Sequence, residues 1–259
     1  MKLKDELSAL TSIIKTLDKK VLIIFLSVGI LQTVSWYYTS GQFYQNNLTE
    51  IAAGRTDSDL RNYLYWFAGD FILLFIIPAA AIKVIFRQKV ADYGFRAGDS
   101  ALGLKITAIS IVPMLITVWF ISSMPSFSEA YPLLSASKES WNIFILFEAA
   151  LLLYLIAWEF LWRGYMLFGL EPAMGYYTVL IQMLPFVILH NGKPALETFG
   201  AIPGAIILGF LALRTRSFLY GVLIHFTLLF GIDLISILRY RTGDYGTGLH
   251  SLLNLLGNL

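Results

Sequence analysis

Long apolar runs, rather than positions that alternate between apolar and polar, dominate this chain. A bilayer core about 30 Å thick needs about 20 consecutive apolar residues in a helix. Runs that reach or approach this length are Val21–Tyr38, Tyr63–Phe86, Leu104–Met124, Asn142–Leu170, Tyr176–His190, Phe199–Leu213 and Phe218–Leu238. The fifth and sixth are shorter than the others. No run alternates as a barrel strand does, so the pattern predicts an all-α bundle of about seven to eight transmembrane helices.

The residues before the first run, Met1–Lys20, show a different pattern. Apolar side chains recur every three or four positions and form one stripe: Leu3, Leu7, Leu10, Ile14 and Leu17. Lysines surround that stripe: Lys2, Lys4, Lys15, Lys19 and Lys20. This arrangement is typical of an interfacial amphipathic helix that lies on an anionic leaflet. A cleaved signal peptide is the alternative, but no small-x-small cleavage site follows Leu31.

Composition supports a membrane protein and excludes several other classes. Of 259 residues, 57% are apolar and 14% are charged, whereas a soluble domain carries about 25% charged residues. The mean hydropathy is +0.69. The chain has no cysteine, which excludes thiol nucleophiles and thiolate metal sites. A net charge of only +2 argues against nucleic acid as a partner, and membrane lipids are the expected surroundings.

Charge placement predicts the orientation in the membrane. Lysine and arginine are dense before the first run and again between the second and third runs, whereas the loops Gly41–Asn62 and Pro125–Trp141 hold few. By the positive-inside rule the N-terminus is cytoplasmic, in a cell membrane expected to be a bacterial inner or plasma membrane. Seven spans would place Arg239 and Arg241 outside, against this rule. Either the apolar tail Leu249–Leu256 folds back, or the span count is wrong by one.

Since no internal repeat and no long linker interrupts the chain, we expect one membrane domain over residues 1–259. Within it we distinguish four parts: the interfacial helix 1–20, the N-terminal spans 21–138, a core 139–238 and a tail 239–259. The spacing Gly200-x-x-x-Gly204 would allow another helix backbone to approach closely.

The apolar runs contain ionisable residues, and each needs a reason because a charge at the bilayer centre costs about 2.5–3.5 kcal/mol. Glu159 and Arg163 are four residues apart in the fourth run, so they share a helix face and can pair. A purely structural ion pair is the alternative. Glu148, about three turns earlier, is expected to line a pore or to form an interhelical hydrogen bond. Asp70 is expected to face the interior, without an obvious partner.

Two of the three histidines, His190 and His225, lie in or at the ends of apolar runs. Imidazole can take up and release protons near neutral pH, or bind a divalent metal. His250, in the polar tail, is expected to be a solvated bystander. Asp233 could orient a histidine on a neighbouring helix or pair with Arg239.

The segment that follows His190 also carries polar residues. Asn191 and Glu197 flank the turn His190-Asn-Gly-Lys-Pro194, which lies between the fifth and sixth runs. Glu197 could stabilise the first turn of the sixth helix or belong to a site.

Three short motifs stand in order on separate apolar runs. They are Trp158-Glu159-Phe160-Leu161-Trp162-Arg163-Gly164, Phe186-Val-Ile-Leu-His190, and a third that begins at His225. Their order resembles the CPBP family, the CAAX-protease and bacteriocin-processing membrane proteins, also called abortive-infection-type proteins. That family carries Glu-Glu-x-x-x-Arg, then Phe-x-x-x-His, then His-x-x-x-Asn or Asp. The resemblance covers about Asn142–Leu238, and Asp92–Asp99 is similar to the loop before the family's core.

Two positions depart from the family's pattern. Trp158 stands where the family has its first glutamate, which is taken as the water-activating residue, and tryptophan cannot act as a base. Leu229 stands where the third motif has Asn or Asp. The chain also resembles a branch of the family with Trp-Glu-Phe, a Gly-Lys-Pro turn and a late aspartate, here Asp233.

The resemblance implies peptide hydrolysis inside the membrane, with a peptide or a lipid-modified protein as substrate. Glu159 is then the expected base for water, while one of His190 and His225 holds the water and the other donates to the oxyanion. Four residues are expected to support them: Arg163, Asp233, Asn191 and Glu197. The same glutamate and two histidines could instead bind a divalent metal such as zinc. We favour chemistry without a cofactor.

Two other functions compete with the intramembrane endopeptidase. A catalytically inactive relative could act as a membrane immunity or accessory protein that binds a peptide or a membrane partner, and Trp158 favours it. A proton-coupled carrier could use Glu148, Glu159 and His225 as a relay. Such carriers often have inverted repeats, and the sequence shows none.

Overall fold

The computed structural model describes residues 3–48 and 58–258. Lys2, one of the lysines expected around the amphipathic stripe, lies outside the described residues. The described part is mainly helical and contains no strand. Its α-helices are α1 (Leu3–Thr16), α2 (Lys19–Val34), α3 (Gly41–Asn47), α4 (Ser58–Phe71), α5 (Ile77–Val84), α6 (Ser100–Ile121), α7 (Pro125–Ala130), α8 (Trp141–Glu159), α9 (Leu167–Met174), α10 (Tyr177–Ile188), α11 (Ala195–Thr215), α12 (Leu219–Thr242) and α13 (Leu249–Leu256).

Shorter helical stretches join several of these helices. Three are π-helical: η1 (Ser35–Thr39), η3 (Ile72–Ile76) and η6 (Phe160–Met166). Two are 3₁₀ turns: η4 (Val90–Tyr93) and η5 (Ser135–Lys138). Because η6 continues α8 into α9 without a break, Trp141–Met174 forms one long helix through the bundle.

Six described helical segments are long and apolar enough to cross a membrane: Lys19–Asn47, Asp59–Val84, Ser100–Ile121, Trp141–Met174, Ala195–Thr215 and Leu219–Thr242. The predicted all-α polytopic bundle is therefore confirmed. The sixth run is longer than expected, because its helix begins at Ala195. The fifth run gives only the 12-residue helix α10, which is shorter than a span and ends before His190.

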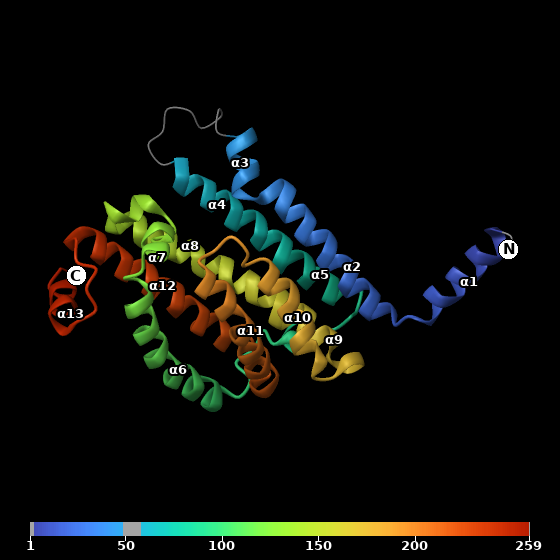
Figure 1. Cartoon of the computed structure of the whole chain (residues 1–259). Helices are drawn as coiled ribbons and strands as arrows, with labels where there is room; N and C mark the ends of the chain where they lie inside the picture. Colours follow the sequence, from blue (N-terminus) through green and yellow to red (C-terminus); the bar gives the residue numbers. More distant parts are fainter. Residues whose placement is uncertain (1–2, 49–57, 259) are drawn as a thin grey trace.

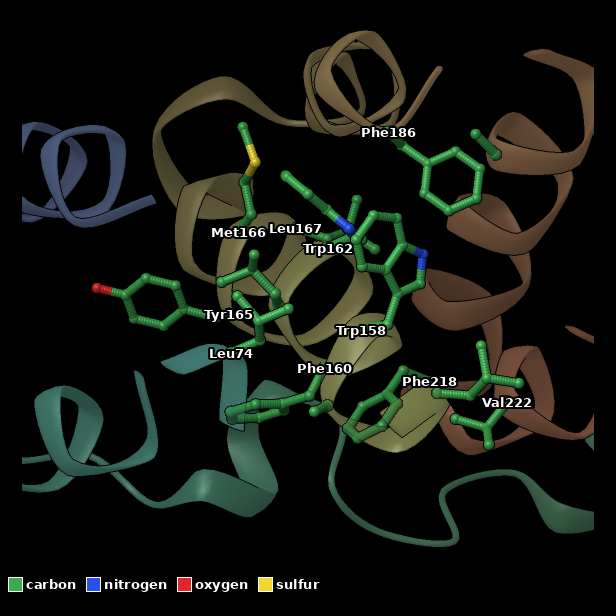
Figure 2. Close-up of a cluster of buried hydrophobic side chains, with 14 of the residues drawn as sticks. Leu74, Trp158, Phe160, Trp162, Tyr165, Met166, Leu167, Phe186, Phe218 and Val222 are labelled. Atoms are coloured by element: carbon green, nitrogen blue, oxygen red, sulfur yellow. The ribbon is translucent and has the colours of Figure 1, made fainter. Parts of the chain in front are cut away.

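The long helix α8–η6–α9 lies at the centre of the bundle (Figure 1). α12 packs against α6 and α8, α4 packs against α8, and α10 packs against α11. Large side chains from η6 fill the space between these helices, and Trp158, Phe186 and Phe218 join them in one apolar cluster (Figure 2). In contrast, α1 projects away from the bundle and buries none of its residues (Figure 1). Its apolar stripe is therefore open to an external partner.

Asp70 in α4 has partners that the sequence did not reveal. Its carboxylate is buried and accepts hydrogen bonds from Ser35 Oγ at 2.7 Å, Thr39 Oγ1 at 2.7 Å and Trp66 Nε1 at 2.8 Å. These bonds connect η1 to α4 and satisfy a group that would be costly to bury alone.

The loop before α6 is attached to the turn between α11 and α12. The backbone amide of Asp99 donates to the Thr215 carbonyl at 2.8 Å, and that of Phe218 donates to the Gly94 carbonyl at 3.3 Å. Gly98 has a φ of +57°, and a Cβ at this position would overlap the Thr215 carbonyl oxygen. Only glycine combines this left-handed backbone with such a close approach.

The C-terminal tail folds back on the bundle, as one of the two alternatives predicted. The fully buried Arg239 donates to the carbonyls of Trp119 (2.9 Å), Asp244 (3.1 Å) and Gly246 (2.8 Å), and to Ser122 Oγ (2.9 Å). Its guanidinium is thus held by α6 and by the tail. The predicted alternative of an ion pair between Asp233 and Arg239 is wrong, since these two described residues form none.

Candidate active site

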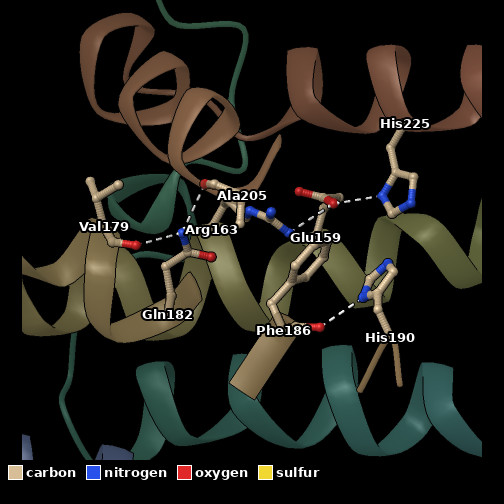
Figure 3. Close-up of polar contacts among 8 residues, drawn as sticks. All are labelled: Glu159, Arg163, Val179, Gln182, Phe186, His190, Ala205 and His225. Atoms are coloured by element: carbon tan, nitrogen blue, oxygen red, sulfur yellow. Dashed lines mark hydrogen bonds and ion pairs between the residues drawn. The ribbon is translucent and has the colours of Figure 1, made fainter. Parts of the chain in front are cut away.

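The centre of the site is a group of three ionisable side chains on α8, η6 and α12, of which the first two are buried and the third, His225, is partly exposed. Arg163 Nη1 donates to Glu159 Oε1 at 3.0 Å, which confirms the predicted pair, and both side chains are inaccessible to solvent. His225 Nδ1 lies 2.9 Å from the same oxygen (Figure 3). The Arg163 guanidinium also lies 4.0 Å from the centre of the Phe186 ring. Because Arg163 belongs to a π-helical stretch, the backbone here departs from a regular α-helix, which is frequent at functional sites.

The hydrogen-bond partners of the two histidines define their tautomers. His190 Nδ1 lies 2.7 Å from the Phe186 carbonyl oxygen, which can only accept, so this nitrogen carries the proton. By the same reasoning His225 Nδ1 donates to the Glu159 carboxylate. In a neutral ring the Nε2 atom is then an acceptor. The two rings face one another in Figure 3, although His225 comes from α12 and His190 from the turn after α10.

A pocket of about 600 Å³ lies beside the two histidines, between α6, α10, α11 and α12. His190, His225 and Phe186 line it, and most of its other walls are apolar. Gly200 and Gly204 also line this pocket, and a Cβ at either would meet no atom within 4 Å. The predicted close approach of another helix at these glycines is therefore wrong.

Glu159 does not itself line the pocket. Its side chain has no accessible surface, and one of its oxygens already accepts from Arg163 and His225. The His225 ring lies between Glu159 and the pocket. A buried carboxylate that accepts from a histidine in this way fixes the orientation and the tautomer of the ring.

The two departures from the family motifs place apolar groups beside the histidines. The Trp158 ring centre lies 6.4 Å from that of His190 and 5.9 Å from that of Phe186. Leu229, one turn after His225 on α12, lines the pocket. Trp158 and Leu229 thus put apolar side chains where the family motifs have polar ones, and the surroundings of the histidines are less polar as a result.

Glu197 lines the pocket and is tied to two neighbours. Tyr131 Oη donates to Glu197 Oε2 at 2.6 Å, and Lys193 Nζ lies 2.6 Å from Glu197 Oε1. Burial raises the pKa of the Tyr131 phenol, and the negative charge of Glu197 raises it further, so Tyr131 stays a donor. Tyr131 belongs to no motif, and no signal in the sequence indicated it.

Two of the expected supporting residues lie apart from the histidines. Asp233 Oδ1 accepts from the Leu133 amide at 2.9 Å, whereas Asp233 Oδ2 and both carboxyl oxygens of Glu148 are buried without a hydrogen-bond partner. The expectation that Glu148 forms an interhelical hydrogen bond therefore stays a prediction. No described contact joins Asp233 to a histidine, since both Nδ1 atoms have other partners. Asn191 is exposed and does not line the pocket, and the tail residue His250 is exposed as expected.

The donor set fits a divalent metal only in part. The Nε2 acceptors of His190 and His225 are suited to two ligand positions, and both rings have the outer hydrogen bond that metal-binding histidines usually make. A catalytic zinc usually has three protein ligands. Among residues 3–48 and 58–258 no group of three or more metal-binding side chains occurs.

Comparison with known proteins identifies the segment that carries this site. Residues 139–231 match the model of one protein family, described as Rce1-like, type II CAAX prenyl endopeptidase Rce1-like. The matched residues include Glu159, His190 and His225. No curated protein and no solved structure matches the chain. The resemblance to the CPBP family is confirmed, and residues 139–231 of this multi-pass membrane protein are similar to the Rce1-like CAAX prenyl endopeptidases.

Proposed function

We propose that the protein is an intramembrane endopeptidase in which His225 activates a water molecule for peptide-bond hydrolysis. One observation carries the proposal: His225 lines the pocket while a fully buried carboxylate, Glu159, holds its Nδ1 atom at 2.9 Å. The family of the matched segment supports the same reaction class.

In this mechanism the proton of the water moves to His225 Nε2. The resulting imidazolium is stabilised by the Glu159 carboxylate, whose charge Arg163 balances at 3.0 Å. Attack of the water on the carbonyl carbon forms a tetrahedral intermediate, and the imidazolium returns its proton to the leaving amine as the C–N bond breaks. His190 presents an acceptor at Nε2, which suits it to hold the second hydrogen of the water rather than to donate to the oxyanion. A divalent metal at the two Nε2 atoms would supply a Lewis acid instead.

The pocket indicates the class of substrate. A cavity of about 600 Å³ with mainly apolar walls fits an apolar segment of a membrane peptide or the lipid group of a modified protein. Its lining helices α6, α11 and α12 are long enough to span a bilayer, so a substrate could arrive from the lipid phase.

The test uses purified protein in liposomes with a fluorogenic CAAX-type peptide, offered with and without a prenyl group. In His225→Asn the amide can still donate to Glu159, but the Nε2 base is lost. We expect hydrolysis to fall by about 10²–10⁴-fold. His250→Asn, at the exposed tail histidine, is the matched control and should keep full activity. Equal hydrolysis by wild type and His225→Asn would contradict the proposal, and we expect wild-type activity to survive a zinc chelator.

A second candidate function is a non-catalytic protein that binds a membrane peptide. It is favoured by the apolar residues Trp158 and Leu229 at positions where the family has polar ones. This function predicts that wild type binds the fluorescent peptide without cleaving it, and that His225→Asn binds it equally well. Glu159→Gln is a poor discriminator, because it leaves Arg163 buried without its counter-charge.

A further inference from the structure

A second, polar cavity lies at the end of the bundle that holds residues 122–140. Its volume is about 10 Å³, which is close to the space needed by one water molecule. Hydroxyl groups and one ammonium group form its walls, among them Ser122, Tyr131, Lys138 and Ser236.

Tyr131 forms a wall of both cavities. On one side it faces Ser236 and Lys138 in the polar cavity, and on the other it lines the pocket of His190 and His225. Tyr131 is 3% exposed, and its hydroxyl donates to Glu197 Oε2 at 2.6 Å. Tyr131 is therefore the residue that the two linings share.

Buried polar atoms continue from the small cavity into the protein. Ser236 Oγ, Asp233 Oδ2 and both carboxyl oxygens of Glu148 are buried without a conventional protein hydrogen bond. The carboxyl oxygens among these atoms can each accept a hydrogen bond from water. Since buried polar groups are normally bonded to protein or to water, this region is suited to water.

We propose that Tyr131 is the gate of a polar route along which water enters the histidine pocket from the end of the bundle that holds residues 122–140. The inference rests on the proposed function, because hydrolysis consumes one water molecule for each peptide bond. Since the walls of the histidine pocket are mainly apolar, that water needs a polar route. Opening requires only that the Tyr131 hydroxyl leaves Glu197, which keeps Lys193 as its partner. By the expected orientation this end is extracytoplasmic.

The chain has no cysteine, so single cysteines report water access without any substrate. Leu229→Cys places a thiol in the pocket one turn from His225. Ser126→Cys, exposed on α7, marks the side of the gate, and Ile109→Cys, 63% exposed on the apolar span α6, is the lipid-facing control. Sealed vesicles receive a charged, impermeant thiosulfonate reagent on one side at a time, and the labelling rate is measured.

We expect Leu229→Cys to be labelled from the same side as Ser126→Cys, while Ile109→Cys stays unlabelled. Adding Tyr131→Phe removes the bond to Glu197 but keeps the ring, and should speed this labelling by about tenfold or more. Adding Ser236→Leu to Leu229→Cys fills the polar cavity and should slow the labelling of this cysteine by a similar factor.

Labelling only from the opposite side would overturn the proposal, because water would then enter through another opening of the pocket. Labelling that neither Tyr131→Phe nor Ser236→Leu changes would also overturn it. Because the two substitutions act in opposite directions, general loosening of the fold cannot imitate the expected result. No peptide is hydrolysed in this experiment, so its failure is separate from failure of the proposed peptidase.

Discussion

Replacing Glu159 by glutamine should destabilise the protein through the charge that remains. The substitution is nearly isosteric, but Arg163 is inaccessible to solvent, and its Nε and Nη2 atoms have no other partner. Breaking a buried ion pair by removing one partner costs about 3–5 kcal/mol. We therefore expect Glu159→Gln to lower the free energy of unfolding by about that amount.

The same reasoning predicts a rescue. Replacing Arg163 by methionine as well removes the uncompensated charge, and double replacement of a buried pair by apolar or neutral groups is often neutral. The double variant Glu159→Gln/Arg163→Met should therefore recover most of the loss. Unfolding in mixed micelles, followed by tryptophan fluorescence for the four members of the double-mutant cycle, measures the coupling.

A matched control is available on the surface. Glu171 accepts from Arg216 at 2.8 Å, but this pair is partly exposed, with the Arg216 side chain 44% accessible. Glu171→Gln should cost less than about 1 kcal/mol. If Glu159→Gln costs no more than Glu171→Gln, or if the double variant is less stable than Glu159→Gln alone, the buried-charge reasoning is refuted.

Three further predictions concern the loops and the tail. Arg239→Met removes the bonds that hold the tail, and should lower stability by about 3 kcal/mol and expose the C-terminal segment to limited proteolysis. Gly98→Ala forces a Cβ into a backbone carbonyl, so it should lower the Tm clearly more than Gly175→Ala, where φ is also positive but the space is open. Hydrogen bonds from the Asn254 side chain and a backbone amide lower the pKa of Asp244 below its ordinary 3.8. The stabilising effect of this carboxylate on the docking of α13 is therefore complete at neutral pH and is lost as the pH falls through the folded-state pKa. Protection of the α13 amides, relative to the intrinsic exchange rate at each pH, should fall in acid for wild type, whereas in Asp244→Asn it should be low already at neutral pH.

Much of the fold follows from local properties of the chain. Hydropathy alone indicates the spans, because each helix must satisfy its own backbone in lipid, and this constraint acts within about 20 residues. The pairing of Glu159 with Arg163 follows from their spacing on one helix. The departures at Trp158 and Leu229 are visible in the sequence, although what these side chains contact is not.

The arrangement of groups from different helices was decided only by the tertiary structure. The motifs predict that Glu159 contacts the water, but packing puts His225 between this carboxylate and the pocket. Neither the position of Tyr131 in the walls of both cavities nor the donors of Asp70 can be read from spacing. A hydrophobic run reports that a helix is buried in apolar surroundings, but it does not report which neighbour each face meets. That choice depends on interhelical packing and on hydrogen bonds between residues far apart in the chain.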